Sequence, residues 1–170
     1  MRRALAVLYS ACGYAAGACL VAMLAMITLN IAGGAFGFFV PGLDAYAGYL
    51  LAATLFLALA PTLKAGEHIR VTLFTGRLGP RAARTTEIAV LVLGVALSGM
   101  MALALGRSAW NSWRFGDVSQ MSDATPLWIP QSVVAFGALV FLVSLIEETV
   151  DELRGQRIRP QAGHEPARIE

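Results

Sequence analysis

The chain has 170 residues, of which 57% are hydrophobic and only 14% charged, and its mean hydropathy is +0.65. These values lie outside the range of a soluble domain of this length, so the composition indicates a membrane protein. About 20 apolar residues cross the ~30 Å hydrocarbon layer of a bilayer. We therefore expect four spans and no second folded domain.

Four stretches of the chain contain no Asp, Glu, Lys, Arg or His, and they cover residues 4–43, 45–63, 88–106 and 127–146. Each is long enough to cross a bilayer. The first is longer than one span requires, and its end, rich in glycine and containing Pro41, predicts a turn. The sequence predicts an all-α membrane protein with transmembrane helices at about 5–31, 44–63, 87–108 and 127–150.

Basic residues are distributed unevenly around these spans. Eleven of the 13 lysines and arginines lie before the first span, between the second and third, or after the fourth. The other two, Arg107 and Arg114, lie between the third and fourth spans. Because cytoplasmic segments carry the excess of Lys and Arg, we expect both termini in the cytoplasm and the first and third connections in the periplasm.

The second connection contains the stretch Gly66–Leu73, in which polar and apolar residues alternate. Alternation favours a strand, but an isolated strand at a membrane surface leaves its backbone unpaired. A short interfacial helix over Val71–Leu78 is one interpretation, and a solvated basic loop is the simpler one.

Acidic side chains cover one face of the helix that continues the fourth span, at Glu147, Glu148, Asp151 and Glu152. They are expected on the same side of the membrane as the arginines of the second connection. We hypothesise that this acidic face pairs with Arg70, Arg77, Arg81 and Arg84. Residues from about 155 to 170 are expected to form a disordered tail.

The third connection is rich in tryptophan and proline. Trp110 and Trp113 are placed within it, and their rings suit the headgroup layer of a membrane. Trp128 and Pro130 begin the fourth span, where a proline is tolerated because the first N–H groups of a helix lack partners. Within the spans, the pairs Gly13/Gly17 and Gly94/Ser98 have the spacing at which helix backbones can approach closely.

The predicted spans lack residues that could conduct ions, bind haem or catalyse a reaction. Proton and ion pathways need ionisable groups at depth, and a haem anchor needs paired histidines, whereas His68 and His164 both lie outside the spans. Cys12 and Cys19 are read as apolar fillers rather than a redox pair. No hydrolase triad, zinc-protease or phosphate-loop motif occurs. We expect no enzyme activity, no cofactor, no metal and no nucleic-acid partner.

Two stretches, Gly66–Leu73 and Thr125–Pro130, carry a family resemblance together with Asn30 and Asp44. With them the chain resembles the small membrane subunit (DctQ type) of tripartite ATP-independent periplasmic (TRAP) transporters, over nearly its whole length. The resemblance implies a scaffold in the bacterial inner membrane, with membrane lipids around it. It also implies two partners, which are a large permease subunit that carries the substrate and sodium sites, and a periplasmic binding protein that delivers organic acids.

The alternative function is a membrane anchor for a quinone- or haem-linked electron-transfer enzyme, which would be red when purified if it bound haem. Asn30 either bonds between helices or caps the end of the first span. The residues expected to contact partners or support the structure are Asn30, Asp44, His68, Arg70, Trp110, Trp113, Pro126, Trp128 and Pro130.

Overall fold

The computed structural model describes residues 2–38, 40–65, 80–121 and 123–154. These residues form four long helices, α1 (Arg2–Phe36), α2 (Leu43–Lys64), α4 (Pro80–Phe115) and α5 (Trp128–Leu153). Each is long and apolar enough to cross a membrane, which confirms the predicted all-α class with four spanning helices. The interfacial helix considered at 71–78 and the tail at 155–170 lie outside the described residues.

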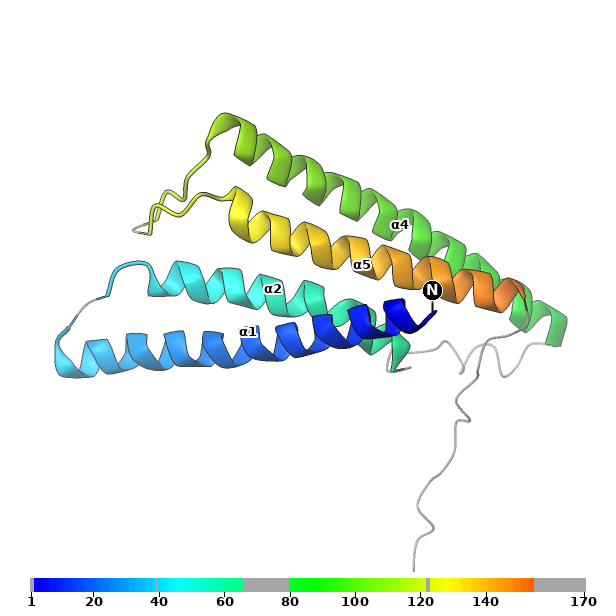
Figure 1. The fold of residues 1–170 in the computed structure, drawn as a ribbon, viewed down its shortest axis with the longest axis horizontal. Coiled ribbons are helices and arrows are strands. Elements are labelled where there is room, and N and C mark those ends of the chain that lie inside the picture. The colour runs from blue at the N-terminus through cyan, green and yellow to red at the C-terminus, as the bar shows by residue number, and fades with distance from the viewer. Residues whose placement is uncertain (1, 39, 66–79, 122, 155–170) are drawn as a thin grey trace, which may run out of the picture.

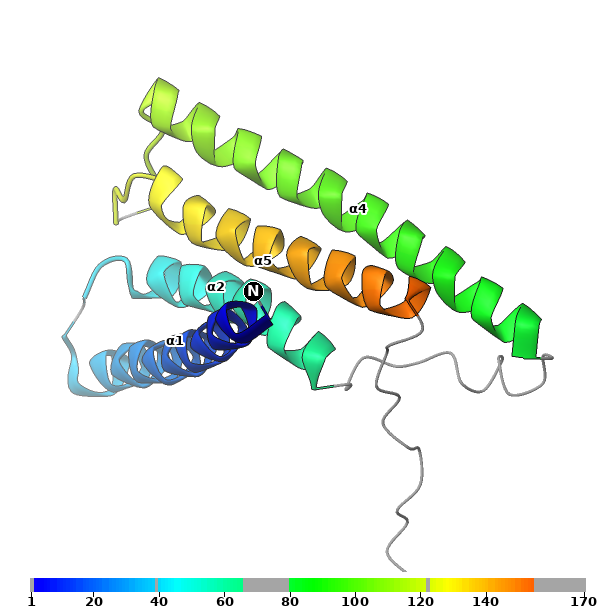
Figure 2. The same ribbon diagram turned by 45° about the vertical axis from the view of Figure 1, so that its right-hand side comes forward.

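The helices stand in a row in the order α1, α2, α5, α4 (Figures 1 and 2). The main contacts are between neighbours in that row, so α1–α2 and α4–α5 form two hairpins that meet mainly where α2 contacts α5. Only 6% of the apolar stretch of α1 and 11% of that of α4 is buried, against 28% for each central helix. The two edge helices therefore leave most of their apolar surface uncovered.

The first hairpin is held by a core of small and medium side chains. Tyr9, Cys12 and Ala16 of α1 lie three and four residues apart, so they share one helix face. They pack against the buried residues of α2 and against Val140 of α5. The buried members of this core are Tyr9, Cys12, Ala16, Ala53, Leu57, Ala60 and Val140.

A close approach of two backbones joins the two hairpins. A Cβ atom at Gly137 of α5 would lie 2.7 Å from the carbonyl carbon of Phe56 in α2, so only glycine fits there without movement. The glycine pair predicted in α1 does not have this role, because Gly17 has no atom within 4 Å of the Cβ position and Gly13 only makes ordinary contact with Pro61.

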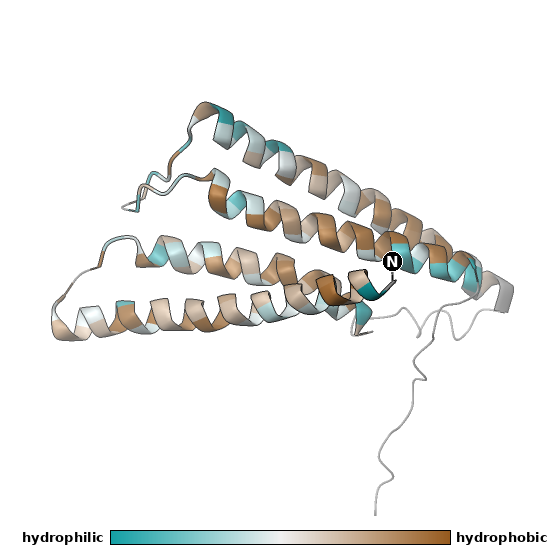
Figure 3. Cartoon of the chain, in the orientation of Figure 1, coloured by the Kyte–Doolittle hydropathy of each residue, from teal (hydrophilic) through white to brown (hydrophobic). Residues whose placement is uncertain are grey.

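Hydropathy changes sharply along the helices (Figure 3). Apolar residues fill their middle parts, and hydrophilic residues gather at the C-terminal end of α5 and at the end of α4 that leads into its connection with α5. At about 1.5 Å per residue, the 36 residues of α4 extend ~54 Å. This helix therefore projects beyond the ~30 Å hydrocarbon layer.

Candidate functional site

The connection between α1 and α2 is fixed by glycine geometry and one polar contact. Helix α1 ends at Gly37 (φ 74°), and the Phe38 N–H donates to the Gly33 carbonyl at 3.0 Å, a helix end of the Schellman type. Beside it, the Asn30 amide donates to the Asp44 carboxylate at 2.7 Å. Asn30 therefore bonds between helices and joins the end of α1 to the first turn of α2.

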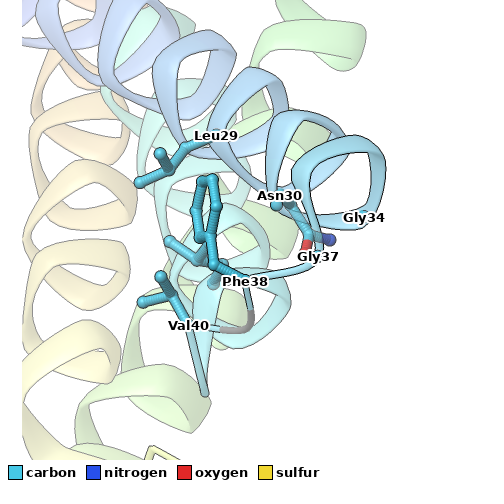
Figure 4. A pocket seen from close by; sticks show the side chains of 8 residues that line it. Leu29, Asn30, Gly34, Gly37, Phe38 and Val40 are labelled. Carbon is cyan, nitrogen blue, oxygen red and sulfur yellow. The ribbon is translucent and has the colours of Figure 1, made fainter.

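An apolar hollow of about 280 Å³ opens beside this contact (Figure 4). Its lining comes from the end of α1 and the connection, and includes Leu29, Asn30, Phe38 and Val40. The amide of Asn30 is the polar side-chain group among these four residues.

The connection between α4 and α5 is compact as well. Gly116 (φ 67°) ends α4, and the Asp117 N–H donates to the Ser112 carbonyl at 3.0 Å, again in the Schellman pattern. The segment then turns back on itself, and Val118 forms an antiparallel bridge with Pro126. The backbone of this connection is therefore tied at both ends.

Asp123 anchors this second connection to the start of α2. Its carboxylate accepts hydrogen bonds from Ser119 Oγ at 2.7 Å and from the Tyr49 hydroxyl at 3.1 Å. Thr125 donates to the Tyr46 hydroxyl at 3.1 Å, and a Cβ at Gly42 would lie 2.8 Å from the Cβ of Asp123. The described residues of the two connections, 37–38, 40–42, 116–121 and 123–127, thus form one surface, which we call the loop platform.

Protonation of Asp123 would loosen the platform only in acid. The hydrogen bond from Ser119, with that from Tyr49, lowers the pKa of this carboxyl below its usual value of about 3.9. A lowered pKa in the folded state means that the stabilisation is present above the usual value and is lost as the pH falls through the lowered one. The hydrogen bonds that hold the second connection to α2 therefore do not change with pH around neutrality.

We predict that Asp123→Asn speeds amide exchange in 117–127 at neutral pH, because the neutral amide accepts these hydrogen bonds more weakly. Hydrogen exchange followed by mass spectrometry measures it. The difference between the variant and the unaltered chain should disappear below the lowered pKa, where the native carboxyl is protonated too. Equal exchange of both chains at neutral pH would contradict the anchor.

Two of the three tryptophans lie in positions different from those expected. Trp110 and Trp113 were placed in the third connection, but they lie in the last turns of α4, with ring centroids 5.1 Å apart. The helix continues past its uncharged stretch because interfacial tryptophan and arginine do not terminate a helix, whereas Gly116 does. Trp128 and Pro130 lie in the first turn of α5, as expected, and Pro126 forms the bridge with Val118.

An ionic cluster lies at the ends of the helices that are opposite the loop platform. We define it as Tyr9, Lys64, Glu147 and Glu148. Lys64 Nζ lies 2.7 Å from a Glu147 oxygen and 3.1 Å from a Glu148 oxygen, and the Tyr9 hydroxyl donates to Glu147 at 3.0 Å. The ammonium also lies 5.6 Å from the centroid of the Tyr9 ring. The cluster joins α1, α2 and α5.

These contacts add Lys64 to the partners expected for the acidic face of α5. Glu147 and Glu148 pair with Lys64 at the end of α2, and Arg84 donates to the backbone carbonyl of Leu153 at 3.3 Å. Arg70, Arg77 and the candidate His68 lie outside the described residues, and the side chain of Arg81 is not described. Lys64 lies on the face of α2 toward α5, so it reaches these carboxylates directly.

The family was established by comparison with family models. The model described as "Tripartite ATP-independent periplasmic transporters, DctQ component" matches residues 23–155, which is most of the chain. The chain belongs to this family. As a DctQ component it is the small membrane component of a TRAP transporter and a multi-pass membrane protein. In TRAP systems the DctQ component associates with a large permease and a periplasmic binding protein. Searches of curated proteins and of solved structures gave no match.

Residues 23–155 include both connections of the DctQ chain, so the loop platform belongs to the part that matches the family. Sequence reasoning missed Tyr46, Tyr49 and Asp123 as platform residues and Gly137 as the close-approach site. The sequence signal for Gly137 was the helical spacing of Val134, Gly137 and Ser144. In the structure these three residues are buried. Asp123 gave no such signal, since its partner Tyr49 lies 74 residues away in the sequence.

Proposed function

We propose that the chain is the non-catalytic small permease subunit of a sodium-coupled, binding-protein-dependent transporter for organic acids in the bacterial inner membrane. Both termini lie in the cytoplasm, so the ionic cluster is cytoplasmic and the loop platform is periplasmic. The subunit holds the large transport subunit in the bilayer, and its platform is part of the surface on which the binding protein docks. Membership of the DctQ family carries this proposal.

The row of helices supports a holding role rather than a carrier role. None of the four apolar stretches contains Asp, Glu, Lys, Arg or His, the residues that mark coupled ion pathways at membrane depth. The edge helices α1 and α4 are largely uncovered along the spans. A large apolar lateral surface without charges suits attachment to another membrane protein.

The loop platform supports the docking role. Both helices that enter it end in glycine-based caps, and the second connection is hydrogen-bonded to α2 through Asp123 and Thr125. A surface that is ordered before a partner arrives loses less conformational entropy on binding. Exposed residues such as Gln120 lie on the second connection and are accessible to a protein in the periplasm.

Uptake of a labelled organic acid into proteoliposomes under a sodium gradient tests the proposal. We expect uptake only when this chain, the large subunit and the binding protein are all present. Uptake by this chain alone, or full uptake by the large subunit and binding protein without it, would overturn the holding role.

The same assay separates docking from holding. Gln120→Trp places a bulky side chain on the platform, so it should raise the binding-protein concentration needed for half-maximal uptake while the two membrane subunits still copurify. Arg154→Trp, at an exposed position beyond the far end of α5, is the matched control and should have no effect. If both variants bind like the unaltered chain, the platform is not the docking surface.

A further inference from the structure

Two arginines stand apart from the charge distribution of the chain. Arg107 and Arg114 are the basic residues outside the three segments that carry the other 11. Both lie in α4 rather than in a loop, and they are seven residues apart, so they fall on the same stripe of the helix. That stripe also contains Leu93 and Met100.

This stripe faces away from the rest of the chain. The buried residues of α4 lie on the opposite side of the helix, and they are Leu91, Ser98, Ala102 and Ser112. Met100 has 69% of its surface exposed. Both arginines are exposed, and among the described residues neither guanidinium has a hydrogen bond or an ion pair. The exposed stripe of α4 is therefore apolar at first and ends at two arginines that have no partner among the described residues.

The stripe has the polarity profile of a lipid molecule. The uncharged stretch 88–106 spans ~28 Å, which matches the hydrocarbon thickness, so Arg107 is the first residue beyond it. Arg114 lies ~10 Å farther along the axis, and the phosphate layer falls between these two levels. Trp110, between them, is 60% exposed and suits the same layer.

We propose that Arg107 and Arg114 form a binding site for the headgroup of an anionic phospholipid. The phosphate accepts hydrogen bonds from the two guanidinium groups, which match its geometry. Trp110 contributes its ring and its indole N–H at the glycerol level. The acyl chains lie along Leu93, Met100 and Leu103. The site requires only that the chain lies in a bilayer, so it is independent of the holding role.

The two arginine charges favour a lipid rather than a protein as the molecule that covers this stripe of α4. A protein that covered the stripe would have to desolvate two cations, which is costly unless it supplies acids in matching positions. Phosphate is present at this depth in any bilayer. The outward stripe of α1, which includes Val7, Tyr14 and Val21, carries no charge and offers the large subunit a surface without this cost.

Native mass spectrometry of the purified complex, delipidated in neutral detergent and titrated with phosphatidylglycerol, tests the site. We expect one phosphatidylglycerol to bind tightly, and the double variant Arg107→Gln/Arg114→Gln to bind it about tenfold more weakly or worse, because two charge-assisted hydrogen bonds are lost. Phosphatidylcholine, which has no net charge, should bind both forms weakly. The control Arg3→Gln/Arg154→Gln removes the same charge at exposed positions and should bind like the unaltered complex.

Equal affinity of the double variant and the unaltered complex would overturn the proposal. If the double variant does not assemble, a photo-reactive side chain at Met100 decides the question in a chain that keeps both arginines. Its main adduct in membranes should be phospholipid. An adduct with the large subunit would show that protein covers this stripe, and the proposal would then be wrong.

Discussion

Gly137→Ala should destabilise the chain, although alanine is the better helix former. The new methyl group would lie 2.7 Å from the carbonyl carbon and 2.8 Å from the carbonyl oxygen of Phe56. Both atoms belong to the backbone of α2, so no side-chain rotation relieves the contact. We expect a loss of about 1–3 kcal/mol in the free energy of unfolding, seen as a lower thermal midpoint in detergent.

A larger residue at this position should separate the two hairpins. Gly137→Leu forces α5 away from α2, and the contact between these two helices is the largest one between α1–α2 and α4–α5. Gly17→Ala and Gly106→Ala are matched controls, because the Cβ positions there have no atom within 4 Å. Both should be neutral or stabilise by up to about 1 kcal/mol through helix propensity. If Gly137→Ala behaves like these controls, the α2–α5 contact is looser than described.

Lys64→Met should produce the second large effect. The methionine keeps much of the apolar stem but removes the cation that lies between Glu147 and Glu148. Because these side chains are three-quarters or more buried, we expect a loss of about 1–3 kcal/mol in the free energy of unfolding. Arg154→Met removes an exposed cation and should change the stability by no more than about 0.5 kcal/mol.

A double-mutant cycle isolates the ion pair from the packing of the lysine stem. If Lys64 and Glu147 interact, the loss in Lys64→Met/Glu147→Gln will be smaller than the sum of the two single losses. We expect a coupling energy of about 1 kcal/mol or more, measured from thermal midpoints at matched salt. Additive losses would show that the lysine contributes through packing alone.

The number and class of the helices could be predicted because a bilayer demands long uncharged apolar stretches, and the chain has four of them. The helix ends were predicted less well. Hydropathy marks where a helix leaves the hydrocarbon, not where it stops, so α4 was expected to end near residue 108. The deciding signal was Gly116, which takes the left-handed conformation just after Phe115.

The site was predicted only as a set of residues. Asn30 and Asp44 were named from the family resemblance. The hydrogen bond between them depends on the path of the chain from the end of α1 to the start of α2. Likewise, the acidic face of α5 was recognised, whereas its partner Lys64 was not. Which cation reaches a carboxylate depends on the rotation of each helix about its own axis, and hydropathy does not determine that rotation within these uniformly apolar spans.

The row of helices also bears on how the chain is made. Most contacts of α1 are with α2, and most of those of α4 are with α5, the helix that follows each of them among the four described. Each hairpin can therefore close soon after its second helix enters the bilayer, before synthesis of the other hairpin is required. The contacts between the hairpins, which join α2 to α5 and Tyr9 to Glu147, form only after the last helix has been made. We expect the first hairpin to insert and pack during translation, and assembly to finish in a single late step at Gly137.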